Sequence, residues 1–197
     1  CHNVLIMGTA AEGKTTLASD LGKYFGTPYS WEWAQNYVRD NAISDWEFDS
    51  TDFMACLEGQ YQQNRTMINA YHNRGVFFAD SDSLTTRMYA EQYAKDDTCT
   101  LTPEEYSRVA IMAEEYARKC RWDKIYILRP KGKFTDGNDR FMIRSSLEVR
   151  EKMFESLVES VKKCYDWSKV TILDGSYIEN FERIVRDVKS VLESGEF

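Results

Sequence analysis

Several features that would assign this chain to a special class of protein are scarce or missing. With three prolines and ten glycines in 197 residues, and with 43% apolar against 29% charged residues, the composition excludes a collagen-like, disordered or low-complexity protein. No apolar run approaches the roughly eighteen residues that span a bilayer, and no basic segment followed by a long apolar one opens the sequence. We therefore expect a cytoplasmic protein with no membrane partner.

Few residues are available for metal clusters or disulfides. The five cysteines are odd in number and each lies at least 21 residues from the next, which disfavours both a disulfide framework and a clustered metal site, so reduced thiols are expected. The net charge of -7 argues against broad nucleic-acid binding, although a local basic patch could hold a small anion. The cysteines are Cys1, Cys56, Cys99, Cys120 and Cys164.

Short apolar runs alternate with longer stretches of helical spacing, which predicts a three-layer α/β protein with a parallel sheet. The length suits a single domain over residues 1–197. At one helix start, Thr102 is expected to be the N-cap, with Pro103 in the first turn and Glu105 completing a capping box. The predicted strands lie at 3–7, 28–31, 76–79, 125–128 and 170–173, and the predicted helices begin at 13 and cover 33–41, 53–73, 83–94, 103–121, 145–165 and 177–193.

The clearest motif is a glycine-rich turn between the first strand and the first helix. Residues 8–15, GTAAEGKT, fit the spacing G-x-x-x-x-G-K-[ST], in which backbone N–H groups at a helix N-terminus surround a phosphate. Lys14 is expected to contact the β- and γ-phosphates, and the Thr15 hydroxyl to ligate Mg²⁺. The predicted nucleotide contacts are Gly8, Gly13, Lys14, Thr15 and Thr16.

Two carboxylates follow the strand at 76–79. Asp80 and Asp82 leave the carboxyl edge of that strand, which is the edge where open α/β sheets bind ligands. One could hold Mg²⁺ and the other could accept a proton from an attacking hydroxyl. The alternative is structural, with Asp80 ending the strand and either Ser81 or Asp82 capping the next helix. The sequence leaves open which carboxylate is the base.

An aromatic segment and a basic loop complete the pattern. Residues 29–39, rich in Trp and Tyr, could stack on a flat acceptor, or could belong to the core. The loop 129–140 concentrates cations directly after a strand, and Arg140 and Arg144 could be delivered to ATP by a lid covering about 129–144. The alternative is a solvated basic surface.

These motifs together resemble the ribosylnicotinamide kinase family, specifically the kinase domain at the C-terminus of NadR-type bifunctional NAD-biosynthesis proteins. The resemblance covers nearly the whole chain. It rests on residues 8–15, on Trp31-Glu32-Trp33, on Asp80-Ser81-Asp82 with the Leu-Thr-Thr that follows, and on Asp136-Gly137 with Arg140 before a long helix. It implies a P-loop kinase fold with a sheet of about five parallel strands, flanking helices and a basic lid.

The resemblance also implies a reaction, in which the γ-phosphate of ATP passes to the ribose 5′-hydroxyl of nicotinamide riboside with Mg²⁺ as cofactor. Trp31 matches the tryptophan that stacks on nicotinamide in the family, and Tyr61 is our choice for the opposite wall. Glu32 belongs to the same acceptor segment, and Asp80 and Asp82 match the acidic pair that binds ribose hydroxyls and Mg²⁺. The implied catalytic residues are Lys14, Asp80, Asp82, Arg140 and Arg144, and the implied metal ligands are Thr15 and Asp80.

The chain departs from the family pattern at two places. Ala10 and Ala11 replace a usual Glu-Ser pair, and Gln35 replaces an arginine. The alternatives are therefore another small nucleoside or nucleotide kinase, and a regulatory module that senses ATP or NAD-related ligands without turnover. With His2 and His72 as its two histidines, the chain lacks the H-x-G-H-like site of an adenylyltransferase, and such a domain, fused upstream or associated, is left open as a partner, as is the oligomeric state.

Overall fold

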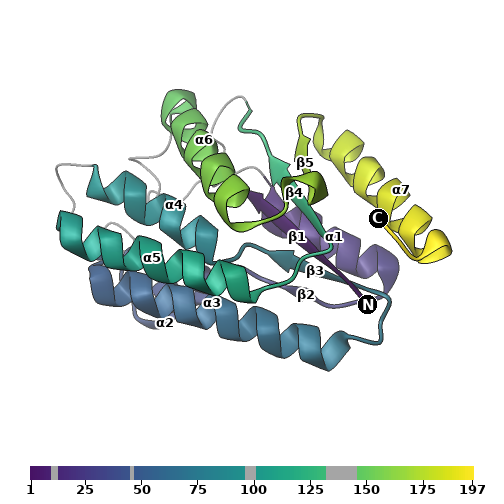
Figure 1. Cartoon of the computed structure of the whole chain (residues 1–197), viewed down its shortest axis with the longest axis horizontal. Helices are drawn as coiled ribbons and strands as arrows, with labels where there is room; N and C mark the ends of the chain where they lie inside the picture. The colour runs from purple at the N-terminus through teal and green to yellow at the C-terminus, as the bar shows by residue number, and fades with distance from the viewer. Residues whose placement is uncertain (10–12, 45–46, 96–100, 132–145) are drawn as a thin grey trace.

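Five parallel strands form one sheet, which confirms the predicted α/β class (Figure 1). The computed structural model describes residues 1–9, 13–44, 47–95, 101–131 and 146–197. The strand order is β2-β3-β1-β4-β5, so the first strand lies at the centre. All five predicted strands are present, including the short one near residue 30. They are β1 (His2–Gly8), β2 (Tyr29–Ser30), β3 (Val76–Asp80), β4 (Lys124–Leu128) and β5 (Val170–Leu173).

Seven helices within the described ranges cover the two faces of the sheet (Figure 1). Val4 and Ile6 of β1 pack into one core with residues of α1 and α7, whereas Leu5 and Met7 pack into the other with residues of α3 to α6. This alternation follows from the two-residue period of a strand, and it makes the domain three layers thick. The helices are α1 (Lys14–Phe25), α2 (Trp33–Asp40), α3 (Ser50–Tyr71), α4 (Ser83–Ala94), α5 (Pro103–Lys119), α6 (Leu147–Cys164) and α7 (Tyr177–Ser194).

The helix starts follow from local capping. Thr102 and Glu105 form the predicted capping box, with Pro103 as the first helical residue of α5. Helix α3 begins three residues earlier than its apolar spacing indicates, because Asp49 and Asp52 form a capping box of their own. Cap chemistry thus defined this boundary better than hydrophobic periodicity did.

The carboxyl ends of the strands meet at one edge of the sheet. Ile6 pairs with Asp80 across β1 and β3, and Gly8 pairs with Leu128 across β1 and β4. Ser30, at the end of β2, pairs with Ala79. The phosphate loop, the acidic strand end and the aromatic segment therefore leave the sheet from the same edge, as the sequence predicts.

Two further expectations concern the described part of the chain. Within it, no helix combines the length and the apolar character needed to cross a bilayer. Among the described cysteines, Cys1, Cys56, Cys120 and Cys164 are free thiols. Cys99 lies outside the described residues.

Candidate active site

The glycines of the phosphate loop occupy positions where a side chain would be strained. Gly13, the N-cap of α1, has φ +78°, a left-handed conformation that L-residues with a side chain rarely adopt. A Cβ on Gly8 would lie 3.1 Å from Cβ of Leu128 on the neighbouring strand. The helix N-terminus that follows is free of a side-chain cap. Its exposed N–H groups are suited to an anion. Residues 10–12 lie outside the described residues.

Lys14, the first residue of α1, is buried between two carboxylates. Its Nζ lies 3.5 Å from Oε2 of Glu32 and 3.8 Å from Oδ1 of Asp80, and its side chain is 5% exposed. Burial by itself would lower the pKa of Lys14, but the charges of Glu32 and Asp80 together outweigh that effect and raise it. Lys14 therefore keeps its positive charge at neutral pH and is held in place before any ligand binds.

Asp80 is fully buried at the end of β3 and contacts the first turn of α1. Its Oδ2 accepts a hydrogen bond of 2.6 Å from the Thr15 hydroxyl, and its Oδ1 accepts one of 3.2 Å from the Ser81 hydroxyl. Burial raises the pKa of Asp80; the Lys14 ammonium opposes this, the Glu32 carboxylate adds to it, and the two hydroxyls oppose it again. The net direction is upward, because the effect of burial outweighs that of the Lys14 ammonium and the two hydroxyls.

The oxygens of Thr15 and Asp80 are the donors that Mg²⁺ prefers. Among the described residues no group of three or more His, Cys, Asp or Glu side chains could hold a metal by itself. Magnesium seldom needs such a cage, because it keeps several waters and takes one or two protein oxygens together with substrate phosphates. The pair Thr15 and Asp80, beside the phosphate loop, fits that mode of binding.

Asp82 lies two residues further on but faces different neighbours. It is the N-cap of α4, where Oδ1 accepts a hydrogen bond of 3.0 Å from the Leu84 N–H, and Oδ2 accepts one from the Tyr165 hydroxyl at the end of α6. Burial raises the pKa of Asp82 to about 6, against the lowering effect of these hydrogen bonds. The capping alternative considered for Asp82 is thus observed, and both of its oxygens have protein partners.

The aromatic segment divides between core and surface. Trp33 packs against the backbone of α3, where a Cβ on Gly59 would lie 2.3 Å from its ring, and it stacks on Tyr37 with ring centres 5.3 Å apart. Trp31, in contrast, is 40% exposed. Of the two tryptophans in this segment, Trp33 is therefore a packing residue and Trp31 is accessible to a ligand.

Tyr61, the residue chosen for the wall opposite Trp31, has a different recorded contact. Its ring stacks on Tyr116 of α5, with centroids 4.6 Å apart. Trp31 lines an open cavity of about 860 Å³ between α1, β2 and the end of α3, and the α3 aromatic on that cavity is Tyr71. Tyr71, and not Tyr61, therefore lines the cavity beside Trp31, while the role of Tyr61 stays a prediction from the family resemblance.

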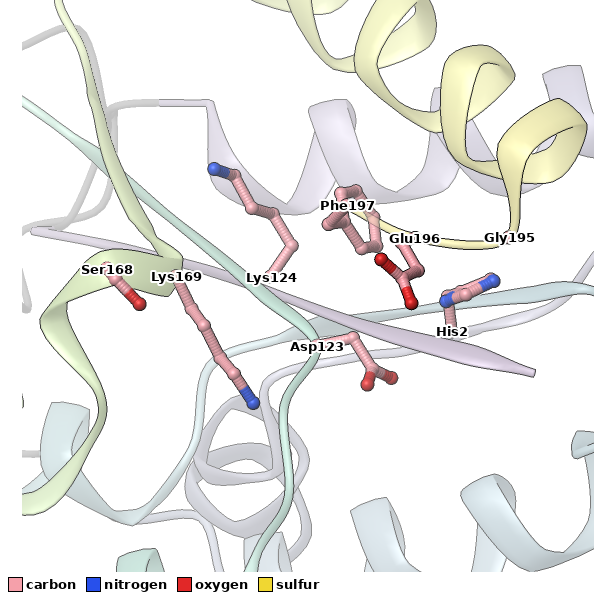
Figure 2. Close-up of a pocket in the computed structure, with 8 residues that line it drawn as sticks. All are labelled: His2, Asp123, Lys124, Ser168, Lys169, Gly195, Glu196 and Phe197. Carbon is pink, nitrogen blue, oxygen red and sulfur yellow. The ribbon is translucent and has the colours of Figure 1, made fainter.

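A second cavity lies at the opposite edge of the sheet, where the strands begin. Its volume is about 390 Å³, and it is lined by His2 at the start of β1, Lys124 at the start of β4, and residues beside the C-terminus (Figure 2). Figure 2 shows the side chains of Lys124 and Lys169 extending in opposite directions. Of the residues that the structure describes in the phosphate loop and the acidic strand end, none lines this cavity.

The predicted lid lies largely outside the described residues, which include neither Arg140 nor Arg144. Its first cations are described. Arg129 has its guanidinium carbon 4.9 Å from the centre of the Phe154 ring and lies 3.9 Å from Asp174, and Lys131 pairs with the same Asp174 at 3.4 Å. Asp174 follows β5, so the base of the basic loop is fixed to the sheet edge.

Amide side chains of α3 hold the aromatic segment, and the sequence analysis missed them. The Gln60 Oε1 accepts a hydrogen bond of 2.8 Å from the Trp33 N–H, and its Nε2 donates one of 3.2 Å to the Trp31 carbonyl. Gln63 donates a further bond of 2.6 Å to that carbonyl. With Asn64, these amides occupy positions i, i+3 and i+4 of one helix face, a polar stripe that could have been found from spacing alone.

Comparison with known proteins gives one consistent result. A family described as "AAA domain" matches residues 3–179. The trifunctional NAD biosynthesis/regulator protein NadR of Salmonella typhimurium is 26% identical over 97% of this chain, and this chain spans 43% of that relative's length. The predicted resemblance to a NadR-type kinase domain is confirmed.

Solved structures agree with the fold. A NadR protein in complex with NR matches 93% of this chain and 50% of its own, with a TM-score of 0.80 and 27% identity. A NadR protein in complex with NAD and AMP-PNP matches with a TM-score of 0.74 and 25% identity, over 93% of this chain and 48% of its own. Deoxyadenosine kinase from M. mycoides, at 14% identity and a TM-score of 0.65 over 95% of this chain and 99% of its own, shares the fold.

Proposed function

Because this chain belongs to the AAA-domain family and resembles NadR proteins, we propose that it is an ATP-dependent kinase whose acceptor is the ribose 5′-hydroxyl of nicotinamide riboside. The observation that carries the proposal is the buried cluster of Lys14, Asp80 and Thr15 at a helix N-terminus, beside the segment that contains Trp31. The phosphate loop and the segment that carries this exposed indole therefore leave the sheet at the same edge. The product is nicotinamide mononucleotide.

The nucleotide end follows from the loop and from Lys14. The uncapped start of α1 offers N–H groups and the positive end of the helix dipole to the phosphates of ATP. Lys14, charged and held between Glu32 and Asp80 at this helix start, would contact the phosphates and stabilise charge on the transferred phosphoryl group. Binding of an ATP analogue by a NadR neighbour supports this assignment.

Magnesium is the cofactor that this donor set suits. Thr15 and Asp80 would hold it, through one hydroxyl and one carboxylate. When bound, the ion neutralises charge on the β- and γ-phosphates. Binding of the acceptor and transfer of its proton are assigned to side chains of the protein.

The acceptor end is assigned to the segment 31–32. Nicotinamide riboside carries a cationic pyridinium ring, and a Trp face attracts such a ring by about 0.5–2 kcal/mol. Trp31 is exposed enough to stack on it, and Glu32 adds a carboxylate whose side chain is 13% exposed. A NadR neighbour in complex with NR supports this acceptor. Tyr61 stays a prediction for the second wall.

In the proposed transfer the ribose 5′-oxygen forms a bond to the γ-phosphorus while the bond from that phosphorus to the β–γ bridging oxygen breaks, and ADP leaves. The hydroxyl proton passes to a carboxylate. Asp80 is favoured over Asp82 for this role, because Asp80 lies beside Lys14 and Thr15 at the phosphate loop, whereas Asp82 caps α4 and bonds to the Tyr165 hydroxyl. Lid arginines, Arg140 and Arg144, would neutralise charge on the phosphoryl group and exclude water.

One experiment tests the proposal against its alternatives. The protein is incubated with ATP, Mg²⁺ and a panel of nucleosides that includes nicotinamide riboside, adenosine, cytidine and thymidine, and phosphorylated products are measured. Preferential formation of nicotinamide mononucleotide is expected. Preference for another nucleoside would identify a different small nucleoside kinase, consistent with the fold shared with deoxyadenosine kinase. Binding of ATP without any phosphorylated acceptor would identify a sensing module.

An adenylyltransferase domain or partner is part of the same proposal. This chain spans less than half of its curated NadR relatives, so those proteins contain a further region of similar size. We infer that nicotinamide mononucleotide made here would pass to an adenylyltransferase. Conversion of nicotinamide riboside to NAD by this chain alone would contradict the proposal that a separate domain or protein carries out the adenylyl transfer.

A further inference from the structure

The turn between Asp80 and Asp82 has an unusual backbone conformation. Ser81 has φ +77°, in the left-handed region that residues with a Cβ seldom occupy. This conformation turns the chain so that Asp80 faces Thr15 while Asp82 caps α4. Strained residues of this kind persist only when their surroundings hold them.

Three hydrogen bonds hold Ser81. Its N–H donates to the carbonyl of Ile6 at 3.0 Å, which extends the ladder between β1 and β3 by one residue. Its hydroxyl donates to Asp80 at 3.2 Å. Its carbonyl accepts from Nδ2 of Asn64 at 3.1 Å, and Asn64, on α3, is 1% exposed. Of these three bonds, the one from Asn64 comes from outside the sheet and its turn.

The side-chain oxygen of Asn64 faces the acceptor segment. Its Oδ1 accepts a hydrogen bond of 2.6 Å from the Ser30 hydroxyl and one of 3.1 Å from Nε2 of Gln60. Ser30 directly precedes Trp31, and Gln60 holds the backbone of Trp31. A single buried amide thus bonds to both the acidic strand end and the start of the aromatic segment.

We propose that Asn64 is a positioning residue for phosphoryl transfer, which sets the separation between the Asp80 carboxylate and the acceptor held by Trp31 and Glu32. The inference rests on the proposed function, since it presumes that an acceptor hydroxyl must approach Asp80. It follows from the geometry because displacement of a reacting group by about 1 Å can cost about a hundredfold in rate. A buried polar network with every member satisfied is also rigid enough to define such a spacing.

The experiment uses a substitution that removes the hydrogen bond donated by Asn64 Nδ2 to the Ser81 carbonyl but keeps an oxygen acceptor for Ser30 and Gln60. Asn64→Asp keeps an acceptor oxygen for Ser30 and Gln60, but replaces the donor to the Ser81 carbonyl with a second oxygen. Ser30→Ala removes the hydroxyl on the acceptor side alone. Gln62→Ala, at an exposed position of the same helix, is the control. Steady-state rates are measured with ATP and nicotinamide riboside, per mole of folded protein.

Asn64→Asp is expected to lower kcat about tenfold or more while the KM for ATP stays within about twofold, because Lys14 and the phosphate loop are untouched. Ser30→Ala is expected to raise the KM for the acceptor more than it lowers kcat. Gln62→Ala should match the wild type. Ser81→Gly, which takes a positive φ without steric cost, should make the Asn64→Asp loss smaller when the two are combined.

Equal rates per folded molecule in Asn64→Asp and wild type would overturn the proposal, and so would a loss that falls equally on both KM values. Hydrogen exchange of the backbone amides tests the role of Asn64 separately from the proposed kinase activity. If the wild type transfers no phosphate, the proposed function fails, and exchange still tests the link itself. Faster exchange of both 29–34 and 80–85 in Asn64→Asp supports the link, and faster exchange of neither, or of one segment alone, overturns it.

Discussion

Asp80 and Asp82 lie two residues apart on either side of Ser81, and they face opposite kinds of surroundings. On the Asp80 side, Lys14 and the Thr15 hydroxyl meet a carboxylate at the phosphate loop. On the Asp82 side, a helix N-terminus and the Tyr165 hydroxyl donate hydrogen bonds to a buried carboxylate. From these surroundings we expect Asp80 to take part in the chemistry and Asp82 to serve mainly the fold.

The two carboxylates differ in the groups that stabilise their negative charge after burial. Asp80 is compensated by a charged partner and is placed to share a cation. Asp82 is buried among neutral donors, and burial raises its pKa to about 6, while burial raises the pKa of Asp80 despite the nearby Lys14 ammonium. Variants beside Asp80 should therefore change mainly the rate of phosphoryl transfer, and variants beside Asp82 should change mainly the free energy of unfolding.

The largest effect is expected from Lys14→Ala. Loss of the one described cation within 4 Å of both Glu32 and Asp80 should reduce kcat about a hundredfold to a thousandfold, in line with removal of a preorganised group that stabilises transition-state charge. Lys23→Ala, at the exposed end of the same helix, is the matched control and should keep full activity. Unchanged turnover in Lys14→Ala would show that the cluster of Lys14 and Asp80 does not take part in phosphoryl transfer.

A paired comparison of Asp80→Asn and Asp82→Asn tests the division directly. Asp80→Asn should lower kcat about a hundredfold, as for loss of a general base, while Asp82→Asn stays within a few-fold of the wild type. Steady-state kinetics at saturating ATP and acceptor measure both. Equal losses would mean that both carboxylates touch the reaction.

Stability should depend on pH through Asp82. Its pKa in the fold, about 6, exceeds the ordinary 3.8, so the folded state binds the extra proton. The stabilisation is complete below about pH 4 and is lost as the pH rises through about 6, a total of about 3 kcal/mol. Asp82→Asn cannot titrate, so its free energy of unfolding, from urea titrations between about pH 4 and 7, should lack this decline. Parallel curves for the two proteins would contradict the assignment.

Tyr165→Phe should have a smaller effect on the same side. Without the hydroxyl, Oδ2 of Asp82 is buried with no donor, which should cost about 1–3 kcal/mol in unfolding free energy at neutral pH. The hydroxyl also accepts from the Trp122 indole at 3.3 Å, so that donor loses its partner too. Thermal unfolding measures the loss, and Tyr24→Phe, whose side chain is 49% exposed, should match the wild type. A neutral Tyr165→Phe would mean that the contact contributes nothing to stability.

The smallest effect is expected from Trp31→Ala, which probes the acceptor linked to the Asp80 side. The KM for nicotinamide riboside should rise about threefold to thirtyfold while that for ATP is unchanged, since the indole is proposed to stack on the pyridinium alone. Trp167→Ala provides a control of similar exposure, 38% against 40%. If both KM values rise together, Trp31 supports the fold rather than the acceptor.

Much of the fold could be predicted because its signals are local. The apolar runs that became β1 and β3, and the capping box at Thr102, depend on neighbours in sequence. The start of α3 was missed because Asp49 and Asp52 look like ordinary surface acids until their reciprocal hydrogen bonds are seen. A capping box of the common Thr-x-x-Glu type was therefore predicted, whereas one with the same spacing built from two aspartates was not.

The site divides in the same way. Lys14 and Thr15 were predicted because the phosphate motif is contiguous, and the structure brings both to Asp80, which the strand end also indicated. The polar stripe that contains Asn64 is visible in the sequence, but the contacts of Asn64 and Tyr165 with the strand end could not be predicted, because they join residues 17 and 83 positions apart. Nothing local distinguishes a buried amide or phenol that serves this turn from one that faces solvent.

By itself, the sequence determined the parallel α/β architecture, the edge at which the loops converge and the groups that can bind a phosphate. These depend on hydrophobic periodicity and on a short motif, both of which act over a few residues. The tertiary structure alone decided that Asp80 faces a lysine, that Asp82 caps a helix, and that an amide of α3 joins the two loops. Charge, burial and hydrogen bonding at these positions come from residues distant in sequence, and only packing brings them within reach.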